Sequence, residues 1–173
     1  LTLFLEFCID RLADFNCALS TWKPSGEQQM HLFTRQAIPM AWDFTEANIS
    51  IRKAISWHTA LGLVADAVAA SSRFIKKKGS IRVGDASALE VEGDSPILVS
   101  TDPPYYDNIS YAALSDFFYA WLRPALKEFF PNSFKTIQVP KSTELIANPY
   151  AQGGADQARV HFEEGFKRVF VRL

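Results

Sequence analysis

The chain has 173 residues and a formal net charge of -1, from 18 Lys and Arg against 19 Asp and Glu. Its 48% hydrophobic and 21% charged residues are typical of a globular protein and exclude wholesale disorder. The near-neutral charge excludes a uniformly basic nucleic-acid-binding domain, although it leaves room for a local basic patch. Cys8 and Cys17 are too few for a Cys-rich zinc site or a disulfide scaffold. No apolar run approaches the roughly 20 residues of a membrane-spanning helix, so we expect no membrane association. The start of the chain resembles neither a signal peptide nor a transit peptide, and a cytoplasmic setting is the expectation.

The first half of the chain shows helical periodicity. Residues 1–20 are predicted to form an amphipathic helix, because apolar side chains recur at three- and four-residue steps between charged ones. Residues 50–75 predict a second long helix, with Ser50 as its N-cap and the sequence Lys76-Lys77-Lys78-Gly79 at its end. Residues 22–48 between them are expected to be irregular, with a turn at Pro24-Ser25-Gly26.

The period changes after Gly79. Residues 80–84 alternate like a short strand, and residues 96–101 form a more continuous apolar run typical of a buried parallel strand. Helices are expected over residues 110–130 and after Gly153-Gly154, with a possible short strand at residues 136–139. Strands alternating with helices from residue 80 onward predict an α/β fold with parallel strands and several long helices.

The most informative stretch follows the second predicted strand. It reads Asp102-Pro103-Pro104-Tyr105, and Tyr106-Asp107-Asn108 comes directly after it. In an open parallel sheet, ligands bind at the edge where such a strand ends. The four residues resemble the Asp-Pro-Pro-Tyr motif of amino-group methyltransferases that use S-adenosylmethionine. The residues that follow narrow the resemblance to adenine-specific DNA methylases of the DUF1156 type.

This resemblance implies a function and a fold. The fold would be a partial Rossmann-like methyltransferase fold, with residues 76–173 as part of the catalytic core and residues 1–75 as a mainly helical segment packed on it. The reaction would be methyl transfer from S-adenosylmethionine to the N6 amine of adenine in DNA, with the base extruded from the duplex. No metal is implied. The large size of these enzymes suggests that the chain is a piece of a longer protein.

The chemistry explains why the motif needs these residue types. An exocyclic amine is a weak nucleophile, because its lone pair is delocalised into the ring. The Asp102 carboxylate and the Pro103 carbonyl can each accept one N–H of that amine and stabilise the charge that develops during attack. Pro103 and Pro104 stiffen the loop, and Tyr105 offers a face for stacking the base. Tyr106 and Asn108 are further candidates for contact with the substrate.

Asp85 and Ala86 are the candidate cofactor residues. They follow the predicted strand 80–84, and in the family the corresponding acid lies near the cofactor adenine. Asp85 would accept the adenine amino N–H, and the Ala86 N–H would pair with the ring. An alternative interpretation makes Asp85 the N-cap of a short turn through Ser87.

The Gly-rich loop that approaches the methionine part of the cofactor in these enzymes has no counterpart in the sequence. We therefore expect it upstream in the parent protein, and we expect this chain alone to bind S-adenosylmethionine poorly and to be inactive. Three alternatives to adenine keep the chemistry: cytosine N4, RNA and a protein glutamine. A fourth is a degenerate methylase fold kept as a non-catalytic binding module.

Overall fold

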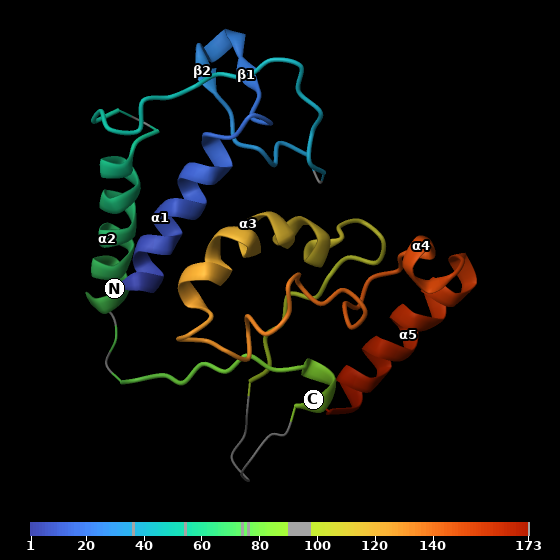
Figure 1. Ribbon diagram of the computed structural model, residues 1–173. Helices are drawn as coiled ribbons and strands as arrows, with labels where there is room; N and C mark the ends of the chain where they lie inside the picture. Colours follow the sequence, from blue (N-terminus) through green and yellow to red (C-terminus); the bar gives the residue numbers. More distant parts are fainter. Residues whose placement is uncertain (36, 54, 74, 76, 90–97, 173) are drawn as a thin grey trace. The chain divides into compact units, whose positions relative to one another are not determined.

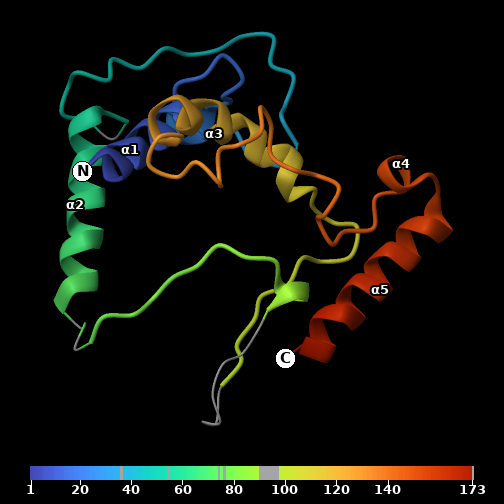
Figure 2. The ribbon, with the colours of Figure 1, turned by 60° about the horizontal axis from the view of Figure 1, so that its bottom comes forward.

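The computed structural model describes residues 1–35, 37–53, 55–73, 75, 77–89 and 98–172, and these are mostly helical. Figures 1 and 2 show the elements in chain order. The α-helices are α1 (Thr2–Phe15), α2 (Trp57–Arg73), α3 (Tyr111–Leu126), α4 (Pro149–Gln152) and α5 (Ala155–Arg172). Two short 3-10 helices, η1 (Pro24–Gly26) and η2 (Ala86–Ala88), and two strands, β1 (Trp22–Lys23) and β2 (Gln28–Gln29), complete the set.

The chain folds as two compact units. The first contains Leu1–Gly79 and Leu114–Val139, and the second contains Ser80–Ala113 and Pro140–Leu173. The expected division into domains at residues 75 and 76 stays a prediction.

The expectation of an α/β fold with parallel strands, and with it the Rossmann-like fold, is wrong. Among the described residues the only sheet is the antiparallel pair β1–β2, in which Trp22 lies opposite Gln29. Residues 80–84 and 98–101 are not in strands, and Pro96 and Ile97 of the second predicted strand lie outside the described residues. The possible strand at residues 136–139 is also absent.

The physical reason is that a strand needs a neighbour. Period-two alternation at residues 80–84 predicts where side chains would point, but a strand forms only when another strand takes up its N–H and C=O groups. No described segment does so, and Ile81, Val83 and Leu98 are each more than 90% exposed. The Val139 N–H donates instead to a carboxylate oxygen of Asp116 on α3, at 2.8 Å.

The predicted helices form, but their starts and ends differ. The second helix begins at Trp57 rather than Ser50, because Ser56 is its cap: the Ser56 Oγ accepts the Thr59 N–H at 3.2 Å. The helix expected over residues 110–130 is α3, which ends earlier, at Leu126, and has Pro124 in its last turn. Gly153 has a φ of 81° and caps α4, so α5 starts at Ala155.

The first unit is built on the packing of α1 against α2, which lie side by side in Figures 1 and 2. Cys8 of α1 is fully buried, Cys17 is half-buried, and both thiols are free. Leu32 is also fully buried, and its N–H donates to Asp14 Oδ1 at 3.0 Å, which ties the hairpin region to α1.

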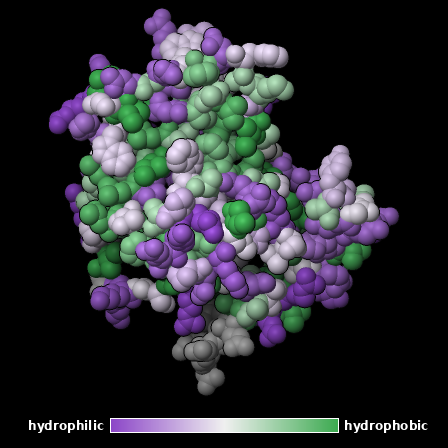
Figure 3. Space-filling model, in the orientation of Figure 1, coloured by the Kyte–Doolittle hydropathy of each residue, from purple (hydrophilic) through white to green (hydrophobic). Residues whose placement is uncertain are grey.

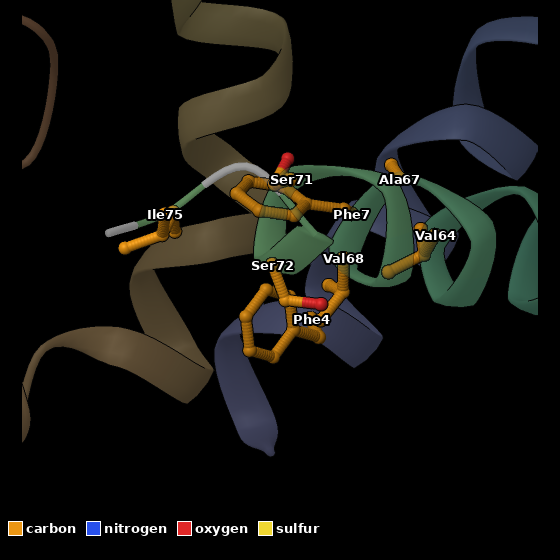
Figure 4. Close-up of a pocket in the computed structure, with 8 residues that line it drawn as sticks. All are labelled: Phe4, Phe7, Val64, Ala67, Val68, Ser71, Ser72 and Ile75. Carbon is orange, nitrogen blue, oxygen red and sulfur yellow. The ribbon is translucent and has the colours of Figure 1, made fainter. Parts of the chain in front are cut away.

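An apolar groove of about 420 Å³ runs along one side of this helix pair. We call it the α1–α2 groove. Figure 4 shows Phe4 and Phe7 of α1 beside Val64 and Val68 of α2, with Ile75 at one end. Phe4, Phe7 and Val68 are between 42% and 46% exposed. Hydrophobic side chains reach the surface elsewhere too, as the green areas of Figure 3 show.

The second unit is organised around α5. Phe162, Phe166 and Phe170 are four residues apart and form a ladder of rings along one face, with ring centroids 4.5 Å and 5.8 Å apart. Figure 1 shows η2, the short green turn, beside the C-terminal end of α5. The helix expected after Gly153-Gly154 is therefore confirmed, and Phe162 of its ring ladder contacts Tyr106, which follows the motif.

Candidate functional site

A cavity of about 250 Å³ in the second unit brings the motif together with η2 and α5. We call it the motif cavity. One wall is the loop Thr101–Pro104, and the facing wall is the apolar side of α5. Ala86 of η2 and Leu145 complete the lining. The predicted cofactor residue Ala86 and the predicted catalytic residues Asp102, Pro103 and Pro104, which begin 16 positions later in the chain, therefore line the same space.

The motif loop lies at the surface. Asp102 and Pro103 are exposed and Pro104 is half-buried. Each proline fixes its own φ near -65°, which restricts the directions that the neighbouring carbonyls take. Because Phe166 and Val169 form the opposite wall, the cavity combines a carboxylate with an apolar surface. That combination suits a flat, aromatic group that carries a hydrogen-bond donor.

The two tyrosines after the prolines are held differently. Tyr105 is 58% exposed, and its carbonyl accepts the Asn108 N–H at 2.9 Å in a tight turn. The ring of Tyr106 meets Phe162 of α5 edge-on, with centroids 5.0 Å apart, and its carbonyl accepts the Ala147 N–H at 2.8 Å. These contacts fasten the end of the motif loop to α5 and to the segment before α4.

Tyr106 also has an unusual backbone. Its φ is 22°, which a side chain with a Cβ rarely adopts. Such a conformation costs free energy and persists only where surrounding contacts enforce it. The hydrogen bond from Ala147 and the contact with Phe162 are those contacts. The motif loop therefore ends in a strained, anchored residue, while Tyr105 just before it is more exposed.

Asp85 is the N-cap of η2, as the alternative interpretation has it. Its Oδ1 accepts both the Ser87 N–H, at 2.8 Å, and the Ser87 hydroxyl, at 2.7 Å. The hydroxyl and then the N–H of Ser87 hold the pKa of this carboxyl below its ordinary value, and the positive charge of Arg168 acts in the same direction. Asp85 does not line the motif cavity, but its cap places the neighbouring Ala86 there.

The remaining predicted site residues lie outside the cavity. Tyr105, Tyr106 and Asn108 follow its lining residues directly in the chain but are not among them. Their assignment to the substrate, and that of Asp85 to the cofactor, stays a prediction.

Several lining residues were missed by sequence reasoning. The sequence assigns no site role to Leu145, nor to Phe166, Val169 and Phe170 of the last helix. Gly165 is the reason that Leu145 reaches this position: it is buried, and a Cβ there would collide with Leu145 Cδ2. A glycine facing a large apolar side chain was the available signal, although the sequence alone does not say which side chain faces it.

The start of α3, which follows the motif loop, is linked to the segment after Pro140 by a hydrogen bond. The Glu144 side chain accepts the Ala112 N–H in the first turn of α3 at 2.9 Å, and the Glu144 carbonyl lies 3.0 Å from His161 Nε2 of α5.

Among the described residues, no three His, Cys, Asp or Glu side chains lie close enough to hold a metal ion.

No family model, no curated protein and no solved structure matches the chain. No helix in the part of the chain that the structure describes is long and apolar enough to cross a membrane. The resemblance to methylases therefore depends on the motif residues themselves, and the arrangement around them carries the functional argument.

Proposed function

We propose that the chain carries the methyl-acceptor part of an S-adenosylmethionine-dependent methyltransferase site that acts on the N6 amine of adenine in DNA. The observation that carries the proposal is the motif cavity, where Asp102 and Pro103 share one space with Ala86. Asp102 is the hydrogen-bond acceptor for the amine, the Pro103 carbonyl is the second acceptor, and Tyr105 stacks on the base.

The size of the motif cavity favours the acceptor over the cofactor. Pockets for drug-sized ligands span roughly 300–1,000 Å³, and this cavity is slightly below that range. A single purine ring suits it better than a nucleoside that carries a methionine chain. The sequence holds no Gly-rich loop of the kind that approaches the methionine part of the cofactor.

Asp102 is the residue whose removal tests the chemistry. Methyl transfer from labelled S-adenosylmethionine to a single-stranded adenine oligonucleotide is to be measured with the chain in its full-length parent. Replacing one positioned hydrogen-bonding group of this kind costs on the order of 100-fold or more in rate. We expect Asp102→Ala and Asp102→Asn to lose at least that much. Asp107→Asn, an exposed aspartate in the same loop, is the matched control and keeps the rate within about threefold.

Two outcomes contradict the proposal. Full methyl transfer by Asp102→Ala would contradict the role assigned to Asp102. Absence of methyl transfer to adenine oligonucleotides by the wild-type parent would contradict the proposed reaction. Parallel assays with cytosine-only DNA, with RNA and with a glutamine peptide identify the acceptor if transfer occurs elsewhere. Absence of transfer to all four leaves the non-catalytic binding module as the function.

A further inference from the structure

A second, basic cavity of about 280 Å³ is also lined by a residue of η2. We call it the basic cavity. Ser87 of η2 lines it together with the C-terminal part of α5, including Lys167, Arg168 and Arg172. Ala86 lines the motif cavity, so consecutive residues of one short turn line the two spaces.

The charges of the basic cavity are unbalanced. Glu164 is its one acidic lining residue and lies 3.8 Å from Lys167 Nζ, in an exposed pair that contributes little to stability. Beyond Glu164, α5 carries three cations and no acid up to Arg172. Among the described residues, Arg168 and Arg172 form no ion pair. The Asp85 carboxylate on η2 also interacts electrostatically with Arg168, so three cations, Lys167, Arg168 and Arg172, are set against two carboxylates, Glu164 and Asp85, and a net positive charge remains. The helix dipole favours cations at this end of α5.

Guanidinium groups are suited to phosphate. Their planar donors match phosphate oxygens in a bidentate geometry, and their charge remains at any physiological pH. An incoming nucleic-acid strand brings one phosphate beside each base, so a base in the motif cavity places its own or the next phosphate a short distance away. The adjacency of the two cavities at η2 fits that arrangement.

We propose that the basic cavity binds phosphodiester groups of the nucleic-acid strand whose base enters the motif cavity. The proposal deepens the function proposed above and depends on it for the identity of the base. DNA and RNA share the phosphodiester, so both are included as test strands. Lys167, Arg168 and Arg172 are the contacts, and their role is to position the strand along η2.

The test is a salt titration of binding. Fluorescence anisotropy of a labelled 12-nucleotide single strand, as DNA and as RNA, is measured with the 173-residue chain between 50 and 300 mM NaCl. The variant Lys167→Gln/Arg168→Gln/Arg172→Gln is compared with Lys23→Gln/Lys127→Gln/Lys135→Gln, which removes the same charge from exposed sites of the first unit. Each lost phosphate contact lowers the slope of log K against log salt by about 0.7 for a single strand.

We expect the basic-cavity variant to lose about two units of slope and at least tenfold in affinity at 100 mM NaCl, with both strands. The control variant is expected to change the slope by less than half a unit. A glutamate oligomer of the same charge, used as competitor, is expected to displace the strand at least tenfold less well than unlabelled DNA. Unfolding midpoints of both variants are measured to confirm that they fold.

Three outcomes overturn the proposal: no strand binding by the wild-type chain, equal slopes for the two variants, or equal competition by the glutamate oligomer. The methyl-transfer assay separates this result from the proposed function. If the basic-cavity variant lowers the salt slope but the parent transfers no methyl group, the phosphate site stands and the proposed reaction is contradicted. If the parent transfers a methyl group but the salt slope does not change in the variant, the reaction stands and the phosphate site is contradicted.

Discussion

The α1–α2 groove and the motif cavity are both partly apolar, but they differ in what their walls can do. The groove is formed by side chains of two helices, and the hydroxyl of Ser72 is already bonded to the Ala69 carbonyl at 2.8 Å. The motif cavity sets the exposed Asp102 and two prolines against the aromatic face of α5. Burial alone gives affinity without orientation, whereas a placed acceptor on a stiff loop aligns a reacting group.

The largest expected effect concerns the stiffness of the motif loop. Replacing Pro103 and Pro104 together by Ala frees both φ angles while keeping Asp102 in place. A misplacement of about 1 Å costs on the order of 100-fold in rate, so methyl transfer in the full-length parent is expected to fall by about that factor. Pro131→Ala, in the first unit, is the control for loss of a proline. Unchanged transfer by the double variant would show that loop rigidity contributes nothing.

The next effect concerns the close approach between Gly165 and Leu145. A methyl group at Gly165 gains about 1 kcal/mol in helix propensity, but it displaces Leu145 from the cavity wall, and such overpacking costs about 1–3 kcal/mol. We expect Gly165→Ala to destabilise the second unit by up to about 2 kcal/mol in urea unfolding. Adding Leu145→Ala relieves the clash, so the double variant is expected to be more stable than Gly165→Ala. The reverse order would contradict the assigned contact.

A smaller effect is expected in the groove. Phe7 is 46% exposed and its ring centroid lies 6.4 Å from that of Phe4, so its truncation loses only part of the burial of a core phenylalanine. Phe7→Ala is expected to lower the unfolding free energy of the first unit by about 1 kcal/mol. Strand binding by the second unit is expected to stay the same. A change in strand affinity would show that the two units do not act independently.

The last effect is electrostatic, is similar in size to that of Phe7→Ala, and lies in α1. Burial and then the charge of Glu6 raise the pKa of Asp10 to about 6, and Asp10 Oδ1 is buried without a hydrogen-bond partner. Because this pKa is higher in the folded state, Asp10 favours unfolding once it ionises, and stability falls as pH rises from about 4 to about 6. After allowance for partial exposure, Asp10→Asn is expected to stabilise the chain by about 1 kcal/mol at pH 7 and to flatten that fall.

Asp66→Asn, an exposed carboxylate on α2, serves as the control for this change. Urea unfolding at pH 4, 5, 6 and 7 is the measurement. If the unfolding free energy of Asp10→Asn falls between pH 4 and pH 7 as much as that of the wild type, groups other than Asp10 cause the pH dependence of stability.

Patterns whose hydrogen bonds are local were predicted well. The apolar faces of α1 and α5 follow directly from side chains three and four residues apart, since a helix satisfies its own backbone. Helix starts were less certain, because Ser50 and Ser56 are equally good caps by residue type and only the bond to Thr59 distinguishes them. The prediction of a strand at residues 80–84 is wrong because a strand needs a pairing segment elsewhere in the chain, and local periodicity does not show whether there is one.

The candidate site also has a part that the sequence predicts and a part that it does not. Asp102, Pro103 and Pro104 are contiguous, so the sequence alone predicts that they act together. Ala86 is predicted as a cofactor residue, and its place in the same cavity as Asp102 follows from the cap that Asp85 forms on η2. Leu145 reaches the cavity through tertiary packing against Gly165, which no spacing in the sequence reveals.

The central claim is that the motif cavity recognises an exocyclic amine through Asp102. The direct measurement is an NMR titration of the isotope-labelled chain with deoxyadenosine, compared with its N6,N6-dimethyl derivative, which keeps the ring and lacks both N–H donors. The account predicts that deoxyadenosine shifts the signals of Ala86, Asp102 and Phe166, that the dimethyl derivative binds at least tenfold more weakly, and that the signals of Phe4 and Phe7 stay unchanged. Equal binding of both compounds, or no shift at the motif cavity, would contradict it.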